Sequence, residues 1–128
     1  MRPDRTPLGV ILIDGGHARA HFAFSFAAGA AAMDRPVTIF ATGAGLHALC
    51  RDWSGLADAA HDAVLIGRGV AGLDVLREAA LSLDVRLLAC EAAMRGEAMA
   101  PSALLDGVRV AGIATFLADL ANAQLISF

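Results

Sequence analysis

The sequence contains no lysine, and all ten of its basic residues are arginines that are spread along the 128-residue chain. The formal net charge is −3 at pH 7. Binding to nucleic acid depends on clustered positive charge, and the sequence shows no basic cluster. We therefore expect no nucleic-acid partner.

Long hydrophobic runs are also missing, although 57% of the residues are hydrophobic. The longest near-continuous apolar stretch covers residues 22–33 and is interrupted by Ser25, whereas a membrane-spanning helix needs roughly 18 or more apolar residues. A second apolar stretch, residues 8–13, follows two arginines but has no signal-peptide cleavage pattern after it. These patterns predict a soluble, cytoplasmic protein without a membrane partner. A soluble chain this apolar is expected to cover part of its surface by self-association.

Cysteine is scarce, with only Cys50 and Cys90 in the chain. No Cys-x-x-Cys pair or zinc-type Cys/His spacing is present, and a structural disulfide is not expected in a reducing cytosol. Each cysteine is therefore either a small buried hydrophobic residue or a reactive thiol. Cys50 lies beside Leu46 and Leu49 in a helical pattern, which is typical of a core position.

Short apolar runs that fit buried strands alternate with segments that fit helices. We expect strands at residues 9–14, 37–41, 85–89, 108–111 and 125–128, and helices at residues 17–33, 46–51, 73–83, 91–99 and 113–123. Residues 52–70 give no clear pattern, and Val64-Leu65-Ile66 fits either a strand or a buried loop segment. The alternation predicts an α/β fold, a three-layer α/β/α sandwich with a mainly parallel five-stranded sheet.

Ligands of open parallel sheets bind at the carboxyl ends of the strands. Three expected loops meet there: Gly15-Gly16-His17, residues 42–45, and Cys90-Glu91. Cys90 ends a predicted strand, and a helix starting just after it would direct free N–H groups at the sulfur and favour the thiolate. The alternative is a buried, structural Cys90, because free cysteine is among the most buried residue types.

The other polar residues near these loops give weaker signals. His17 and His21 have the i, i+4 spacing of a helical metal site, but the sequence has neither the carboxylate of a HExxH motif nor an evident third ligand. We therefore predict no metal, and assign His17 and His47 to the cleft, where His17 could hydrogen-bond to a thiolate. Gly43 and Gly45 match no phosphate-binding motif, so turn formation explains them better.

Three segments carry a family resemblance: AAAMDRPVTIFATGAGLHAL, residues 30–49; LLACEAAMRG, residues 87–96; and the tail, residues 104–128. They are similar to the DsrE/DsrF-like family of sulfur-handling proteins. The first segment resembles the family's second-strand region, where an alanine-rich helix leads into a strand and a glycine-containing turn. LLACEAAMRG, residues 87–96, resembles the family's cysteine segment. The tail, residues 104–128, is similar to its closing strand, helix and strand. Only residues 52–70 fall outside the resemblance.

The resemblance implies one domain over residues 1–128, a five-stranded parallel sheet, and assembly into homotrimers or homohexamers. It also implies that Cys90 accepts sulfur as a persulfide and passes it to a partner, with a donor or acceptor protein at the other end of the exchange. No cofactor is expected. The cleft beside Cys90 is expected to contain His17, Gly43, Gly45, His47, Glu91 and Arg95.

The chain departs from the family pattern in the turn after the second strand. Family members often carry an aromatic residue there, whereas this chain has Ala44 and Gly45. The pocket beside Cys90 is therefore expected to be more open. The alternative to a sulfurtransferase-like carrier is a non-catalytic, oligomeric module that binds a small ligand and uses Cys90 only as a structural residue.

Overall fold

The structure, a computed structural model, describes residues 5–128; residues 1–4 of the expected domain lie outside the described part. The described chain forms a five-stranded sheet with the order β4-β3-β2-β1-β5. All four strand pairs are parallel, as predicted. The strands are β1 (Leu8–Leu12), β2 (Val37–Ala41), β3 (Arg86–Cys90), β4 (Val108–Ala111) and β5 (Gln124–Ser127).

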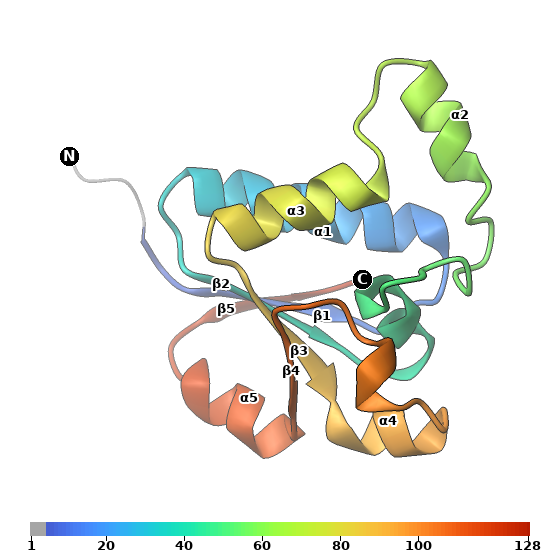
Figure 1. Ribbon diagram of the computed structural model, residues 1–128. Coiled ribbons are helices and arrows are strands. Elements are labelled where there is room, and N and C mark those ends of the chain that lie inside the picture. The colour runs from blue at the N-terminus through green and yellow to red at the C-terminus, as the bar shows by residue number, and fades with distance from the viewer. Residues whose placement is uncertain (1–4) are drawn as a thin grey trace.

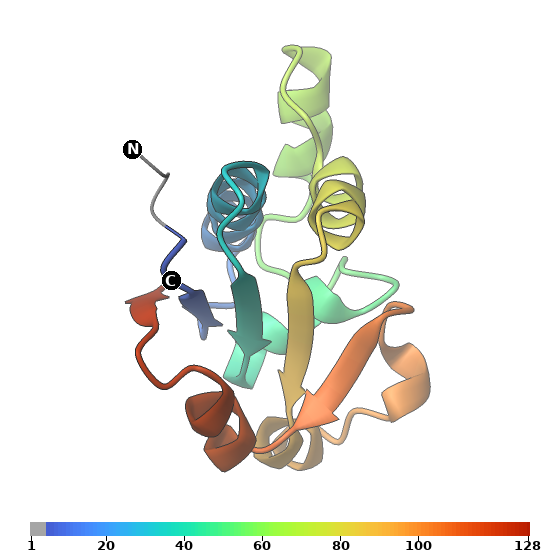
Figure 2. The same ribbon diagram turned by 90° about the vertical axis from the view of Figure 1, so that its left-hand side faces the viewer.

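Helices cover both faces of the sheet (Figure 1). The long α1 and α3 lie side by side over one face, and α5 lies against the other, as the turned view shows (Figure 2). The helices are α1 (His17–Ala32), α2 (His61–Gly67), α3 (Leu73–Ser82), α4 (Glu91–Gly96) and α5 (Ile113–Asp119), with 3-10 turns η1 (Gly43–Leu49) and η2 (Pro101–Ala103). This arrangement confirms the predicted α/β/α sandwich.

The segment that the sequence left open contains a helix rather than a strand. Val64-Leu65-Ile66 lies inside α2, which projects beyond the end of α3 (Figure 1). Both earlier alternatives are therefore wrong: the segment is neither a strand nor a buried loop, and the side chains of Val64 and Ile66 are 41% and 57% exposed. The helical piece expected at residues 46–51 is the 3-10 turn η1, which begins three residues earlier.

The core consists of two clusters, one on each face of the sheet. Alternate residues of β3 belong to different clusters, because successive side chains of a strand point to opposite faces. Leu87 and Ala89 join the cluster under α1 and α3. Leu88 and Cys90 join a smaller cluster together with Phe116 of α5.

None of the helices within residues 5–128 is long and apolar enough to cross a membrane.

Candidate functional site

Cys90 is the last residue of β3 and the N-cap residue of α4. Its backbone is extended, with φ −63° and ψ 121°, so the chain turns from strand to helix at this residue. The residue is 8% exposed. The strand-to-helix junction that the sequence predicted therefore exists, at the edge of the sheet where parallel strands place ligand sites.

The side chain of Cys90 belongs to the apolar cluster on the α5 face. The other buried members are Phe40, Leu88, Phe116 and Leu120. The rings of Phe40 and Phe116 stack with their centroids 4.7 Å apart. The register pairs Cys90 with Ala111 of β4, a small side chain on the same face. The thiol is thus held against aromatic and aliphatic side chains, with only a small part of it in contact with solvent.

Two cavities have Glu91, the residue after Cys90, in their walls, and Cys90 itself lines neither of them. A cavity of about 290 Å³ lies between β3, β4 and α5, and its wall includes Leu88, Glu91 and Ala111. A second cavity of about 300 Å³ lies beside α4 and includes Glu91 and Arg95. Glu91 and Arg95 form an exposed ion pair with 3.0 Å between Oε1 and Nη2. Glu91 follows Cys90 directly in the chain, and Arg95 lies one helical turn further along α4.

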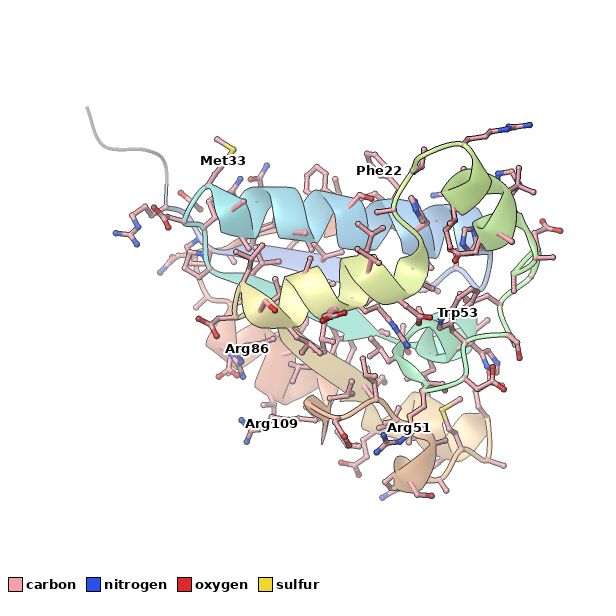
Figure 3. The ribbon with its side chains drawn as sticks, turned by 45° about the horizontal axis from the view of Figure 1, so that its top comes forward. Phe22, Met33, Arg51, Trp53, Arg86 and Arg109 are labelled. Atoms are coloured by element: carbon pink, nitrogen blue, oxygen red, sulfur yellow. The ribbon has the colours of Figure 1, made fainter. Side chains whose placement is uncertain are left out.

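Two arginines that the sequence analysis did not select line the cavity between β3, β4 and α5. They are Arg86 and Arg109, and they project from the same flank of the molecule (Figure 3). Arg86 is paired with Asp119 at 3.0 Å. Arg109 shares the sheet face of Cys90, because it lies two residues before Ala111 on β4. In the sequence, each of these arginines stands out only as a charged residue in a short, otherwise apolar strand. That pattern does not indicate on which face of the sheet the arginine lies.

Gly43, Gly45 and His47 all lie in η1, and none of them is in the wall of either cavity lined by Glu91. Gly43 adopts a φ of +53°, which favours glycine, and a Cβ on Gly45 would lie 2.4 Å from the carbonyl oxygen of Leu12. The two glycines are therefore explained by the turn, as the sequence analysis inferred. His47 packs on the backbone of Gly55, where an added Cβ would lie 2.5 Å from its Nδ1.

His17 does not face Cys90 in the structure. It begins α1 on the opposite side of the sheet, and its Nε2 lies 2.7 Å from Oδ1 of Asp62, a residue in the segment that gave no clear sequence pattern. The proposed hydrogen bond from His17 to the thiolate therefore has no support, since the ring is engaged elsewhere. Asp62 was missed because its partner is 45 residues away along the chain.

Cys50 is the C-cap residue of η1 and is buried, as expected for a core position. Its Sγ lies 3.6 Å from the carbonyl oxygen of Leu46 and 3.5 Å from Sδ of Met99. Burial raises the pKa of the Cys50 thiol above its usual value, and the nearby Arg77 guanidinium offsets part of that increase. This environment disfavours the thiolate at Cys50.

Within residues 5–128, no group of three or more His, Cys, Asp and Glu side chains is placed to hold a metal ion.

Comparison with known proteins adds a family and two structural neighbours. No curated protein matches the sequence. A protein of unknown function from Methanobacterium thermoautotrophicum, MTH1491, has a similar structure with a TM-score of 0.64 and 19% identity over 96% of this chain and 99% of its own. The YchN protein of E. coli has a TM-score of 0.70 and 12% identity over the same shares. At these identities the likeness concerns the fold alone. The model of the DsrE/DsrF-like family matches residues 8–128, and this chain therefore belongs to that family.

Proposed function

We propose that this protein is a sulfur carrier that accepts sulfur as a persulfide on Cys90 and passes it to a partner. The observation that carries the proposal is the position of Cys90: it ends a central strand of a DsrE/DsrF-like sheet and caps the next helix. Membership of a family of sulfur-relay proteins supports this role for the cysteine at that strand end.

The chemistry needs only the thiol and a persulfide donor. The Cys90 thiolate attacks the outer sulfur of the donor, R–S–SH. A new S–S bond forms on Cys90, the S–S bond of the donor breaks, and the donor leaves as a thiolate that takes up a proton. Attack by an acceptor thiolate on the outer sulfur of Cys90 reverses the sequence and restores the thiol. No oxidant is required, because one S–S bond replaces another.

Charged residues around the cavity between β3, β4 and α5 support an anionic sulfur. Parallel-strand geometry puts the Cα atom of Arg109 about 8 Å from that of Cys90, within reach of an extended arginine side chain. Within the described residues Arg109 forms no ion pair, whereas the other arginine of this cavity, Arg86, is neutralised by Asp119. Glu91 opposes a negative charge on the sulfur, and its pairing with Arg95 reduces that effect. We assign Arg109 the role of stabilising the thiolate and persulfide.

Exposed apolar side chains on the α5 face support a protein partner. Ile113 and Leu117 of α5 are 53% and 52% exposed, and Leu125 of the edge strand β5 is also exposed. Such surface on a small domain is typical of an interface. We propose that the donor or acceptor protein, and further copies of this chain in a homotrimer or homohexamer, cover apolar surface of this kind.

The burial of Cys90 among Phe40, Leu88 and Phe116 favours a second candidate function. In that alternative the protein is a non-catalytic oligomeric module, and Cys90 is a core residue. The two candidates differ in what happens when the thiol meets a sulfur donor.

The deciding experiment exposes the wild type, Cys90→Ser and Cys50→Ser to a low-molecular-weight persulfide and measures the intact masses. We expect the wild type and Cys50→Ser to gain the mass of one sulfur atom and Cys90→Ser to gain none. Sulfur uptake by Cys90→Ser but not by Cys50→Ser would assign the wrong cysteine. Unmodified wild-type protein would favour the binding module.

A further inference from the structure

A buried histidine–carboxylate pair lies at the start of α1, far from the chemistry proposed for Cys90. His17 and Asp62 are 1% and 5% exposed, and 2.7 Å separates Nε2 from Oδ1. The same Oδ1 accepts the backbone N–H of Leu73 at 2.9 Å, which fixes the carboxylate between α1 and α3. Neither residue belongs to the cluster around Cys90 or to the cavity between β3, β4 and α5.

The pairing determines which nitrogen of His17 carries the proton. A carboxylate only accepts hydrogen bonds, so Nε2 is the donor and Nδ1 of the neutral ring is an acceptor. Nδ1 is buried and has no hydrogen-bond partner. Buried polar atoms without a partner are rare in folded proteins, because their lost hydration is not replaced. Nδ1 therefore has an unused hydrogen-bonding position.

Three aromatic side chains surround the His17 ring. The ring centroids of His21, Trp53 and His61 lie 5.5, 5.9 and 6.2 Å from it. Hydrogen bonds hold two of them: His21 donates to the carbonyl of Ala71 at 2.8 Å, and Trp53 donates to a carboxylate at 2.7 Å. The His61 ring is exposed and has no hydrogen bond within the described residues, so it is the ring most free to move.

A cavity of about 680 Å³ adjoins this cluster, and His17 and His61 are in its wall. Its volume falls in the range of small-molecule sites. The wall carries charges of both signs: the carboxylates of Asp14 and Asp58 and the guanidinium of Arg19. A ligand that carries only one sign of charge would meet repulsion from part of this wall.

The N-terminus of α1 supplies an anion-binding position in the same cavity. This helix has 16 residues and no side-chain cap. The N–H of Gly16 bonds to Asp14 and that of His17 to the carbonyl of Ala57. The next two N–H groups, of Ala18 and Arg19, have no acceptor within the helix, and both residues line the cavity. Free N–H groups at a helix start bind carboxylates and similar anions.

We propose that this cavity binds a free α-amino acid. Its carboxylate occupies the start of α1 and pairs with the Arg19 guanidinium. Its ammonium group, which has three donors, faces Asp58 and donates to Nδ1 of His17. Nδ1 is closed off from solvent, so binding moves the rings around it, His61 in particular. The proposal is independent of sulfur transfer at Cys90.

Trp53 provides the assay, because it is the single tryptophan of the chain and its ring is 5.9 Å from His17. The non-fluorescent standard amino acids are titrated one at a time into the full-length protein, to about 10 mM, while tryptophan emission is recorded. We expect at least one to give a saturable change with a Kd below about 1 mM. Acetate and ethylamine, which carry one charged group each, should give no saturable change in this range.

Exposed residues of the cavity allow variants that leave the core intact. Arg19→Gln and Asp58→Asn should each weaken binding about tenfold, the effect of losing one charged contact of about 1.4 kcal/mol. The matched controls are Arg68→Gln, another exposed arginine, and Asp84→Asn, which like Asp58 has a positive φ. Both controls should bind as the wild type does.

Three results would overturn the proposal. The first is that no amino acid gives a saturable change in the wild type. The second is that acetate binds as tightly as the best amino acid, which would make the site a simple anion site. The third is that the two control variants lose as much affinity as Arg19→Gln and Asp58→Asn.

Discussion

The reactivity of Cys90 is expected to depend on Phe116, the residue of α5 that covers the cluster containing the thiol. Phe116 is fully buried, and its ring stacks on Phe40. Phe116→Leu removes an aromatic pair worth about 0.5–1.5 kcal/mol and leaves a smaller side chain. We estimate a total loss of about 1–1.5 kcal/mol in the free energy that holds α5 over the sheet.

This loss converts directly into a labelling rate. When opening is fast relative to labelling, a thiol reagent reacts with Cys90 in proportion to the open population. A loss of 1–1.5 kcal/mol increases that population by roughly five- to twelvefold, since about 1.4 kcal/mol is a factor of ten. We therefore expect Phe116→Leu to accelerate labelling of Cys90 roughly five- to twelvefold, measured with a coloured disulfide reagent in the Cys50→Ser background.

Phe24→Leu is the matched control, because Phe24 is equally buried but lies in the cluster under α1 and α3. It should lower the global stability by a similar amount and change the labelling of Cys90 less than about twofold, if Cys90 is reached by local opening of α5. An equal acceleration by both variants would show that Cys90 reacts only through global unfolding. No acceleration by Phe116→Leu would show that α5 does not control access to the thiol.

The remaining predictions concern Gly45 in η1, the buried Cys50, and Arg109 in the cavity between β3, β4 and α5. Gly45→Ala should lower the free energy of unfolding by about 1–3 kcal/mol in urea titrations, because its Cβ would lie 2.4 Å from a backbone oxygen; an unchanged midpoint would contradict the close contact. Burial in the folded protein raises the pKa of Cys50 above its usual value of 9.0, so the thiol of the unfolded chain loses its proton at a lower pH than that of the folded chain. The free energy of unfolding should therefore fall as the pH rises past the pKa of Cys50 in the unfolded chain. Urea titrations should show a smaller loss between about pH 8 and 10 for Cys50→Ala than for the wild type, and an equal loss would refute this assignment. Arg109→Gln should slow persulfide uptake by Cys90 about threefold to tenfold, the usual scale of one charge interaction; mass spectrometry over time measures the rate, and an unchanged rate would remove Arg109 from the site.

The alternation of strands and helices could be predicted because the strands are parallel and the inner ones are buried on both faces. Such strands read as short apolar runs, and the strand predicted at residues 37–41 has the bounds of β2, which is buried throughout. The strand predicted at residues 108–111 has the bounds of β4, although this edge strand is partly exposed. The α3 helix was also recognisable, since Leu73 and Ala80 lie at helical spacing and pack in the core. In β2 and α3 local pattern and burial agree.

The α2 helix could not be predicted because its apolar side chains do not follow burial. Val64 and Ile66 are exposed, and the buried residue of this helix is the acidic Asp62. Periodicity identifies a helix only when its apolar side faces the core. The contact that holds Asp62 is made with His17, 45 residues earlier, and no local pattern reveals it.

The position of Cys90 at a strand end was predictable, but the direction of its side chain was not. Side chains alternate along a strand, so Cys90 shares its face of the sheet with Leu88. Which helix covers that face depends on the tertiary fold: α5 covers it, whereas α1, which begins with His17, covers the other face. No local pattern reveals this, and the expectation that His17 meets the thiol has no support for this reason.

The sheet itself separates the two sites. Cys90 belongs to the α5 face at β3, and the His17–Asp62 pair lies among α1, α2 and α3 on the other side. Between them are β2 and the close-packed side chains under α1 and α3, which have no polar connection to Cys90 in the described residues. A ligand beside His17 can therefore influence the thiol only through a movement of the sheet, and packed interiors resist such movement. Variants at Arg19 should leave sulfur uptake unchanged, and Cys90→Ser should leave the Trp53 response unchanged.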